Sequence, residues 1–155
     1  MDCGPAALKS VLDGFGIHAS YGRLREACQT DVDGTSIDQI EDAAVALGLD
    51  AAQVMLPLDH LFARSARTLP AIVVVRQPNG AHHFVVVWRR HGRWLQIMDP
   101  AVGRRWTTWR TLLNDVLVHS HSVEAAAWRE WAGSDTFLRS IAECARSVGA
   151  EVANL

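Results

Sequence analysis

The sequence predicts an α+β fold, in which helices near both ends of the chain flank an antiparallel sheet. Apolar residues recur at helical spacing before residue 50, and this spacing returns near the C-terminus. Between them, residues 71–99 contain β-branched runs separated by turn residues. A chain of 155 residues that is 49% hydrophobic and 21% charged can bury one good core, so we expect one globular domain.

The first helix is expected to begin near Pro5, because proline suits the first turn of a helix. Its apolar positions are Ala7, Leu8, Val11, Leu12 and Phe15. Gly14 and Gly16 are expected to end it. Ser20 is the expected N-cap of a short second helix through Leu24 to Cys28.

The third helix has the clearest boundaries in the sequence. Ser36 and Gln39 form the pattern of a capping box, and Gly48 is the expected stop. The apolar stripe between them consists of Ile37, Ile40, Ala44 and Leu47. A short strand near residues 51–55 and a helical turn over residues 57–63 are expected to lead into the sheet.

The sheet is expected to be an antiparallel meander, because "PNG" and "HG" punctuate the β-branched runs. A helix capped by Thr107 or Thr108 and a strand over residues 116–121 should follow it. An amphipathic helix over residues 134–148, ended by Gly149, completes the expected elements.

Domain organisation and composition narrow the possible classes of protein. We expect residues 1–121 to form the domain and residues 122–155 a helical extension. With 15 Lys and Arg, 17 Asp and Glu and no basic stripe, the chain is not expected to bind nucleic acid. The runs "AIVVV" and "FVVVW" are shorter than the roughly 18 residues of a spanning helix, and no signal-peptide pattern precedes them. Three widely spaced cysteines favour a reducing compartment over a disulfide framework.

The hairpin between the two long strands decides which side chains face one another. In a three-residue loop over residues 90–92, the glycine takes the last position, which is left-handed in a turn with a G1 bulge. Residue 89 then pairs with 93, 87 with 95, 85 with 97 and 83 with 99, so His83 lies directly across from Asp99. A two-residue loop, His91-Gly92, would instead place Phe84 opposite Asp99.

An imidazole beside a carboxylate suits acid–base chemistry, because the carboxylate fixes the tautomer and stabilises the imidazolium. Cys3 supplies a nucleophile, since the start of a helix favours thiolate over thiol. A cysteine at a helix N-terminus, with a distant His and Asp on neighbouring strands, is typical of papain-like thiol hydrolases. Cys3 is then the nucleophile, His83 the base and later the acid, and Asp99 the residue that orients His83.

Four segments also carry a family resemblance: "DCGPAAL", "GTSIDQIEDAAVALGL", "HFVVV" and "DPAVGRR". In this order, over residues 1–118, they resemble the bacteriocin-processing cysteine peptidase family, which cuts double-glycine leader peptides and usually stands at the N-terminus of bacterial ABC exporters. The resemblance implies a papain-like α+β fold. It also assigns Cys3, His83 and Asp99 to the family's three catalytic positions.

The resemblance implies a cysteine endopeptidase that removes double-glycine leaders from bacteriocin or peptide precursors. Its expected partners are the precursor peptide and the membrane and ATPase domains of an exporter, which would hold it at the cytoplasmic face of the cell membrane. No cofactor is expected for this domain, and ATP would act only through a fused or partner transporter.

Two departures from the family pattern qualify this expectation. Family members carry a glutamine about six residues before the cysteine that helps to bind the oxyanion, and here that position would precede Met1. Losing such a donor typically costs about 100- to 1,000-fold in turnover. We therefore expect that the chain starts at an internal methionine or is a fragment. No transmembrane or ATPase segment follows, so residues 122–155 are either a stub of the connection to an exporter or a covering helix.

Alternative interpretations remain open. A degenerate domain could bind leader peptides for an exporter without cleaving them; the presence of Cys3 favours the enzyme and the absent glutamine favours the binding module. Another acyl-transfer enzyme could use the same fold. A metal site built from Cys3, His82, His83 and Asp99 lacks the usual ligand spacing. Cys28 and Cys144 lie on apolar stripes and are expected to be buried.

Overall fold

The structure is a computed structural model that describes residues 2–32, 34–57, 61, 68–120 and 122–147. The chain divides into two compact units, Met1–Val118 and His119–Leu155. The boundary predicted from the sequence lies after residue 121. No helix among the described residues is long and apolar enough to cross a membrane.

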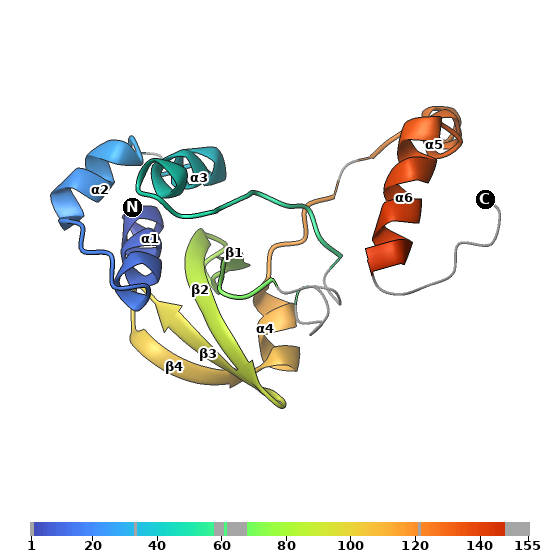
Figure 1. Cartoon of the computed structure of the whole chain (residues 1–155). Helices are drawn as coiled ribbons and strands as arrows, with labels where there is room; N and C mark the ends of the chain where they lie inside the picture. The colour runs from blue at the N-terminus through green and yellow to red at the C-terminus, as the bar shows by residue number, and fades with distance from the viewer. Residues whose placement is uncertain (1, 33, 58–60, 62–67, 121, 148–155) are drawn as a thin grey trace. The chain divides into compact units, whose positions relative to one another are not determined.

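The first unit opens with three helices, α1 (Cys3–Gly14), α2 (Tyr21–Ala27) and α3 (Ile37–Ala46), as Figure 1 shows. The hydroxyl of Ser20 accepts the N–H of Arg23 at the start of α2. At the start of α3, Ser36 and Gln39 form both hydrogen bonds of the capping box. The three predicted helices are confirmed, and at the starts of α2 and α3 these side chains satisfy backbone donors that have no partner inside a helix.

Helix α1 joins the helical part of this unit to the sheet. Ala7 and Val11 pack against Val86 of the sheet, while Leu8 and Leu12 pack with the buried residues of α2 and α3. Phe15, expected on the same stripe, is instead the C-cap residue and is 54% exposed. Two faces of one helix are thus buried against different neighbours, which fixes the position of its N-terminus.

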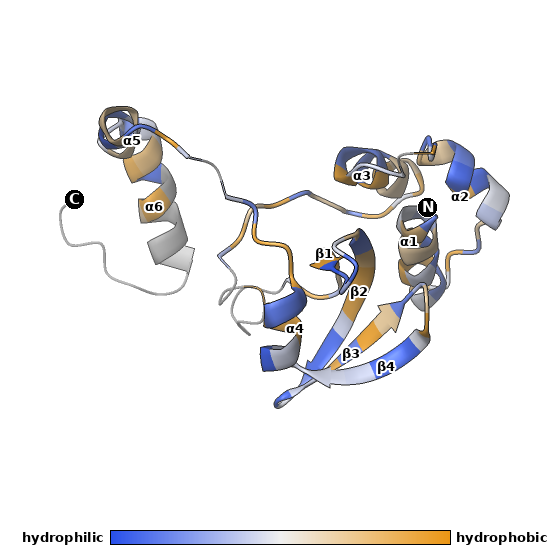
Figure 2. Ribbon diagram, turned by 180° about the vertical axis from the view of Figure 1, so that it is seen from behind, coloured by the Kyte–Doolittle hydropathy of each residue, from blue (hydrophilic) through white to orange (hydrophobic). Residues whose placement is uncertain are grey.

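The sheet contains β1 (Ala71–Arg76), β2 (His82–His91), β3 (Trp94–Asp99) and β4 (Gly103–Thr108), antiparallel and in that order. Helix α4 (Trp109–Asp115) follows, with Thr108 as its N-cap. The predicted meander is confirmed, and β4 extends it beyond the predicted range. Leu112 of α4 packs on one face of the sheet, whose buried residues are Val73, Val75, Val85, Val87, Leu95 and Ile97. Figure 2 shows that the hairpin end of β2 and β3 is hydrophilic, whereas the parts nearer α1 are hydrophobic.

The register of the β2–β3 hairpin differs from the predicted one. The loop is Gly92-Arg93, and His91 pairs with Trp94. Gly92 has a φ of +58° at the first loop position, as a type II′ turn requires. The predicted three-residue loop is therefore wrong, and so is the two-residue alternative one position earlier.

A β-bulge at Trp88 then shifts the ladder by one residue, so that Val87 pairs with Ile97 and Val86 with Met98. Continued to the end of β3, this register sets Val85, not His83, directly opposite Asp99. Without the bulge, Asp99 would lie opposite Val86, on the face away from His83. The bulge therefore returns Asp99 to the face of the sheet that carries His83.

Two strands predicted for this unit are not formed as expected, because the segments lack a neighbouring strand with which to pair. Residues 51–55 are not a strand, and Val54 and Met55 are 62% and 73% exposed. The strand expected over residues 116–121 reduces, within its described part, to a single bridge between Val116 and Val75. The helical turn expected over residues 57–63 lies mostly outside the described residues.

The second unit contains α5 (Ala125–Ala132) and α6 (Asp135–Ser147). Helix α6 confirms the helix predicted near the C-terminus, whose expected stop at Gly149 lies outside the described residues. Helix α5 was not predicted, because its N-cap, Glu124, makes no side-chain capping bond that a sequence pattern could signal. The rings of Trp131 and Phe137, with centroids 4.3 Å apart, connect the two helices.

Candidate active site

Cys3 is the first residue of α1 and is partly exposed. The preceding residue, Asp2, is the N-cap, and its carbonyl accepts the N–H of Ala6. The N–H groups of the first helical turn have no acceptor inside the helix, and the helix dipole adds positive potential there. The thiol of Cys3 thus stands where negative charge is favoured.

Gly4 explains why the helix can begin so close to the loop before α3. A Cβ atom at Gly4 would lie 2.8 Å from Cβ of Thr35, closer than side chains pack. Thr35 is itself held by a 2.6 Å hydrogen bond with Thr30. The absence of a side chain at Gly4 therefore lets the start of α1 approach this loop.

Helix α2 holds the start of α1 through two contacts with Asp2. Arg25 Nε lies 3.3 Å from Asp2 Oδ1, and the hydroxyl of Tyr21 donates to the carbonyl of Asp2 at 3.3 Å. Burial, together with the negative charge of Asp2, raises the pKa of Tyr21. The phenol therefore stays protonated and remains a donor.

His83 and Asp99 form a close pair at the end of the sheet. His83 Nε2 lies 2.8 Å from Asp99 Oδ1, and His83 is only 8% exposed. The other ring nitrogen, Nδ1, has no hydrogen-bond partner among the described residues. One nitrogen is thus held by a carboxylate while the other is left for proton transfer.

Asp99 is held by two further donors. The N–H of Ala101 donates to Oδ1 at 3.0 Å, and Arg105 Nε donates to Oδ2 at 3.3 Å. Burial alone would raise the pKa of Asp99, but the hydrogen bond with His83, the N–H of Ala101 and the charges of His83 and Arg105 together lower it. Asp99 is therefore ionised at neutral pH and can stabilise an imidazolium.

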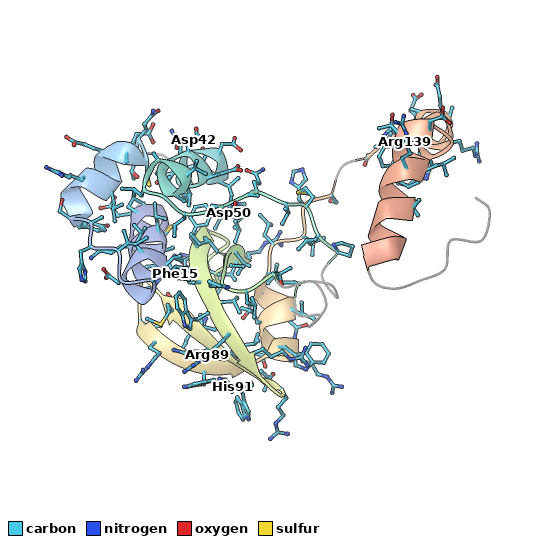
Figure 3. The ribbon with its side chains drawn as sticks, viewed as in Figure 1. Phe15, Asp42, Asp50, Arg89, His91 and Arg139 are labelled. Atoms are coloured by element: carbon cyan, nitrogen blue, oxygen red, sulfur yellow. The ribbon has the colours of Figure 1, made fainter. Side chains whose placement is uncertain are left out.

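The meander brings these residues to one place. Because consecutive strands run in opposite directions, the β1–β2 turn and the β3–β4 turn lie at the same end of the sheet. Figure 3 labels Arg89 and His91 toward the opposite, hairpin end. The first turn of α1 meets the β1–β2 and β3–β4 turns around a cavity of about 340 Å³, which is lined by Asp2, Cys3, Ala6, Tyr21, Gln77, His83, Pro100 and Ala101.

The structure thus brings Cys3, the predicted nucleophile, and His83, the predicted base, to a single cavity. Asp99 is hydrogen-bonded to His83. His82 is exposed and pairs with Arg76 at the end of the β1–β2 ladder. Among the described residues, no three His, Cys, Asp or Glu side chains gather as metal ligands would. The metal alternative therefore has no geometric support in this part of the chain.

Sequence reasoning missed three residues at this site: Tyr21, Gln77 and Arg105. Arg105 pairs with Ile97 in the β3–β4 ladder, two residues from the pair that Asp99 makes with Gly103. The alternation of a fourth strand after "DPAVG" would have placed it on the face of Asp99. No pattern in the sequence signals Tyr21 or Gln77, because their positions depend on how α2 and the β1–β2 turn pack.

A second cavity, of about 460 Å³, lies beside α2 and is lined mainly by apolar atoms. His18 and Arg23 contribute to its wall, but Cys3 and His83 do not. It is therefore separate from the candidate active site.

Comparison with known proteins identifies the family. Residues 1–114 match the Peptidase C39 family. The chain is 34% identical over 103 residues to the lactococcin-G-processing and transport ATP-binding protein LagD of Lactococcus lactis subsp. lactis, and 37% identical over 99 residues to the pediocin PA-1 transport/processing ATP-binding protein PedD of Pediococcus acidilactici. These matches cover 66% and 64% of this chain, which spans only 14% of the length of either relative.

The fold agrees with a solved structure. The peptidase domain of Streptococcus ComA, a bi-functional ABC transporter involved in a quorum-sensing pathway, matches with a TM-score of 0.66 at 31% identity. The match covers 74% of this chain and 85% of that domain. The predicted α+β architecture, with N-terminal helices on an antiparallel sheet, is confirmed. Together, the matched residues and the shared architecture show that this chain belongs to the Peptidase C39 family.

Proposed function

We propose that this chain is a cysteine endopeptidase that removes a double-glycine leader from a precursor peptide. The observation that supports this proposal most is that Cys3 and His83 line one cavity, while Asp99 is hydrogen-bonded to Nε2 of His83. A nucleophile, a base and a group that orients the base are the parts that thiol catalysis needs. The names of LagD and PedD couple processing to transport, which agrees with this reaction.

In the proposed mechanism, His83 takes the proton from Sγ of Cys3, and the thiolate attacks the carbonyl carbon of the scissile bond. The resulting oxyanion accepts hydrogen bonds from N–H groups at the start of α1. His83 then gives its proton to the leaving amine, and a thioester remains on Cys3. Water that His83 deprotonates releases the leader, while the ionised Asp99 stabilises the imidazolium in both steps.

Three of the residues that line the cavity have small apolar side chains. Ala6, Pro100 and Ala101 add little that could bind a side chain of the substrate. A pair of glycines can bring its backbone close to such a wall. This supports a double-glycine substrate, as the resemblance implies.

The proposed setting follows from the same relatives. The partner is an ABC exporter, whose membrane and ATPase domains would hold the peptidase at the cytoplasmic face of the membrane. ATP would be used by the exporter, and the peptidase reaction itself needs no cofactor.

The test is cleavage of a synthetic double-glycine leader peptide, followed by mass spectrometry. We expect cleavage after the second glycine by the wild-type chain and none by Cys3→Ala or His83→Ala. The neighbouring His82→Ala variant is the matched control and should cleave normally, because His82 is exposed outside the cavity. Peptide binding without cleavage would instead support the binding module, and cleavage that survives Cys3→Ala would exclude the proposed mechanism.

A further inference from the structure

Gln77 lines the same cavity as Cys3 and His83, although it belongs to the turn between β1 and β2. We propose that Gln77 is a substrate-binding residue whose side-chain amide binds a peptide group of the glycine pair next to the scissile bond. This inference rests on the proposed function, because it assigns part of the recognition of that substrate to a particular side chain.

The register of the sheet directs Gln77 toward the site. Val75 pairs with His83 in the β1–β2 ladder, so their side chains share a face of the sheet. Gln77 lies two residues beyond Val75, and side chains two residues apart point to the same side of a strand. The backbone therefore sends the Gln77 side chain to the face of His83, in agreement with its place in the cavity wall.

The backbone of Gln77 is held by the turn. Its N–H donates to the carbonyl of Ala81 at 2.9 Å, and its carbonyl accepts the N–H of Gly80 at 2.8 Å. Asn79 Oδ1 accepts the N–H of Ala81 at 3.0 Å, and Gly80 takes a φ of +82° that favours glycine. Both backbone polar groups of Gln77 are thus used, and the residue has little freedom to move away from the cavity.

The side-chain amide, by contrast, has no hydrogen-bond partner among the described residues, and Gln77 is partly buried. Two other glutamines of this unit are used structurally: Gln96 accepts from Arg89, and Gln39 completes the capping box. An amide that is partly buried and has no hydrogen-bond partner, on a residue whose backbone is fixed by a turn, can form hydrogen bonds with a ligand.

Several other polar groups of the wall are absent or already used, whereas the side-chain amide of Gln77 is not. Pro100 has no N–H, the N–H of Ala101 donates to Asp99, and the hydroxyl of Tyr21 donates to Asp2. A primary amide offers both an acceptor and donors, which match the N–H and C=O that one residue of an extended peptide presents on the same side. Because glycines have no side chains to recognise, contacts with their backbone must supply part of the binding.

The first experiment measures peptide binding separately from cleavage. Cys3→Ala is compared with Cys3→Ala/Gln77→Ala by fluorescence anisotropy, with a labelled double-glycine leader peptide that extends past the cleavage site. Loss of one neutral hydrogen bond should raise Kd about 2- to 12-fold. Gln53→Ala is the matched control, since Gln53 is exposed and outside the cavity, and it should leave Kd unchanged. An unchanged Kd in the Gln77→Ala variant would overturn the assignment.

The second experiment identifies the peptide group. Each glycine of the pair is replaced in turn by N-methylglycine, which removes one backbone N–H of the peptide. With one of these two peptides, Gln77→Ala should cause no further loss of binding, as coupled partners in a double-mutant cycle require. Full additivity with both peptides would contradict a contact to either N–H and so overturn the proposed pairing.

Kinetics on the cleaving enzyme separate substrate binding from other roles. Gln77→Ala should raise KM and leave kcat nearly unchanged, because the contact is made equally in the ground state and the transition state. If kcat instead falls by about 100-fold or more while KM stays constant, the assignment is overturned in favour of an oxyanion contact. If the wild-type chain binds the peptide but does not cleave it, the proposed function fails, while the binding comparison still decides the role of Gln77.

Discussion

Replacing Asp99 with asparagine removes the negative charge beside His83 and keeps the size of the side chain. His83 Nε2 is 2.8 Å from Asp99 Oδ1, and both side chains are about nine-tenths buried, at 9% and 10% exposure. At the effective dielectric constant of about 20 that suits such sites, unit charges about 4 Å apart attract by about 4 kcal/mol. The imidazolium that forms during catalysis loses this stabilisation.

An attraction of about 4 kcal/mol corresponds to roughly 1,000-fold in rate. Arg105 is present in both proteins, so its repulsion of the imidazolium cancels from the comparison, and relaxation of the amide offsets part of the loss. We therefore expect Asp99→Asn to lower kcat/KM by about 100- to 1,000-fold.

The assay is cleavage of the leader peptide at pH 7, with Asp13→Asn as the control. Asp13 is exposed, and within the part of the chain that the structure describes its side chain pairs only with Lys9, so its substitution should change kcat/KM little. A loss below about fivefold for Asp99→Asn, the effect of an exposed ion pair, would refute the reasoning. Acid unfolding gives a second readout. Because the pKa of Asp99 is lower in the folded chain than its ordinary value of 3.8, ionised Asp99 stabilises the fold at pH values above 3.8. That stability is lost as the pH falls through the pKa that Asp99 has in the folded chain. The wild-type chain should lose this increment on acidification and Asp99→Asn should lack it throughout.

Three further predictions follow from the same contacts. Arg105→Ala removes one of the charges that lower the pKa of Asp99, so the acid side of the plot of kcat/KM against pH should move to higher pH. An unchanged plot would contradict the contribution of Arg105 to the pKa of Asp99. Burial raises the pKa of Cys28, which is 0% exposed, so iodoacetamide at pH 7 should modify Cys3 and spare Cys28 until the chain is unfolded, as peptide mapping would reveal. Gly4→Ala places a Cβ against Thr35 and should destabilise the fold by about 1–3 kcal/mol in urea unfolding, with a parallel loss of kcat/KM; full stability would show that the start of α1 can shift freely.

The candidate site could be predicted from the sequence even though one step of the reasoning was wrong. The predicted register set residue 83 against 99, whereas the observed ladder leads to 85 against 99. Both place His83 and Asp99 on one face, because they differ by two residues and the side-chain period of a strand is two. Neighbours displaced by two residues across a ladder remain within reach of a long side chain, so the pair still forms.

Local signals explain which elements were predictable. The capping box of Ser36 and Gln39 depends on residues three apart, and the structure has both of its bonds. The strand expected over residues 51–55 depended on a partner that alternation alone cannot supply. The bulge at Trp88 was equally hidden, because its indole packs beside Phe15 and over Gly14, contacts that only the folded helix provides.

Gln77 and Arg105 were missed for a related reason. Their significance lies in what other segments bring to them, namely the start of α1 for Gln77 and the end of β3 for Arg105. A single sequence shows the residues that carry chemistry, such as Cys3, more readily than those that support it.

Trapping the acyl-enzyme tests the central claim most directly. The wild-type chain and His83→Ala are each mixed with a double-glycine leader peptide, quenched in acid within milliseconds to seconds, and analysed by mass spectrometry after digestion. We predict a thioester between Cys3 and the carboxyl end of the leader in the wild-type chain, and none in His83→Ala. Cleaved leader without any adduct on Cys3, or an adduct that forms equally without His83, would contradict the account.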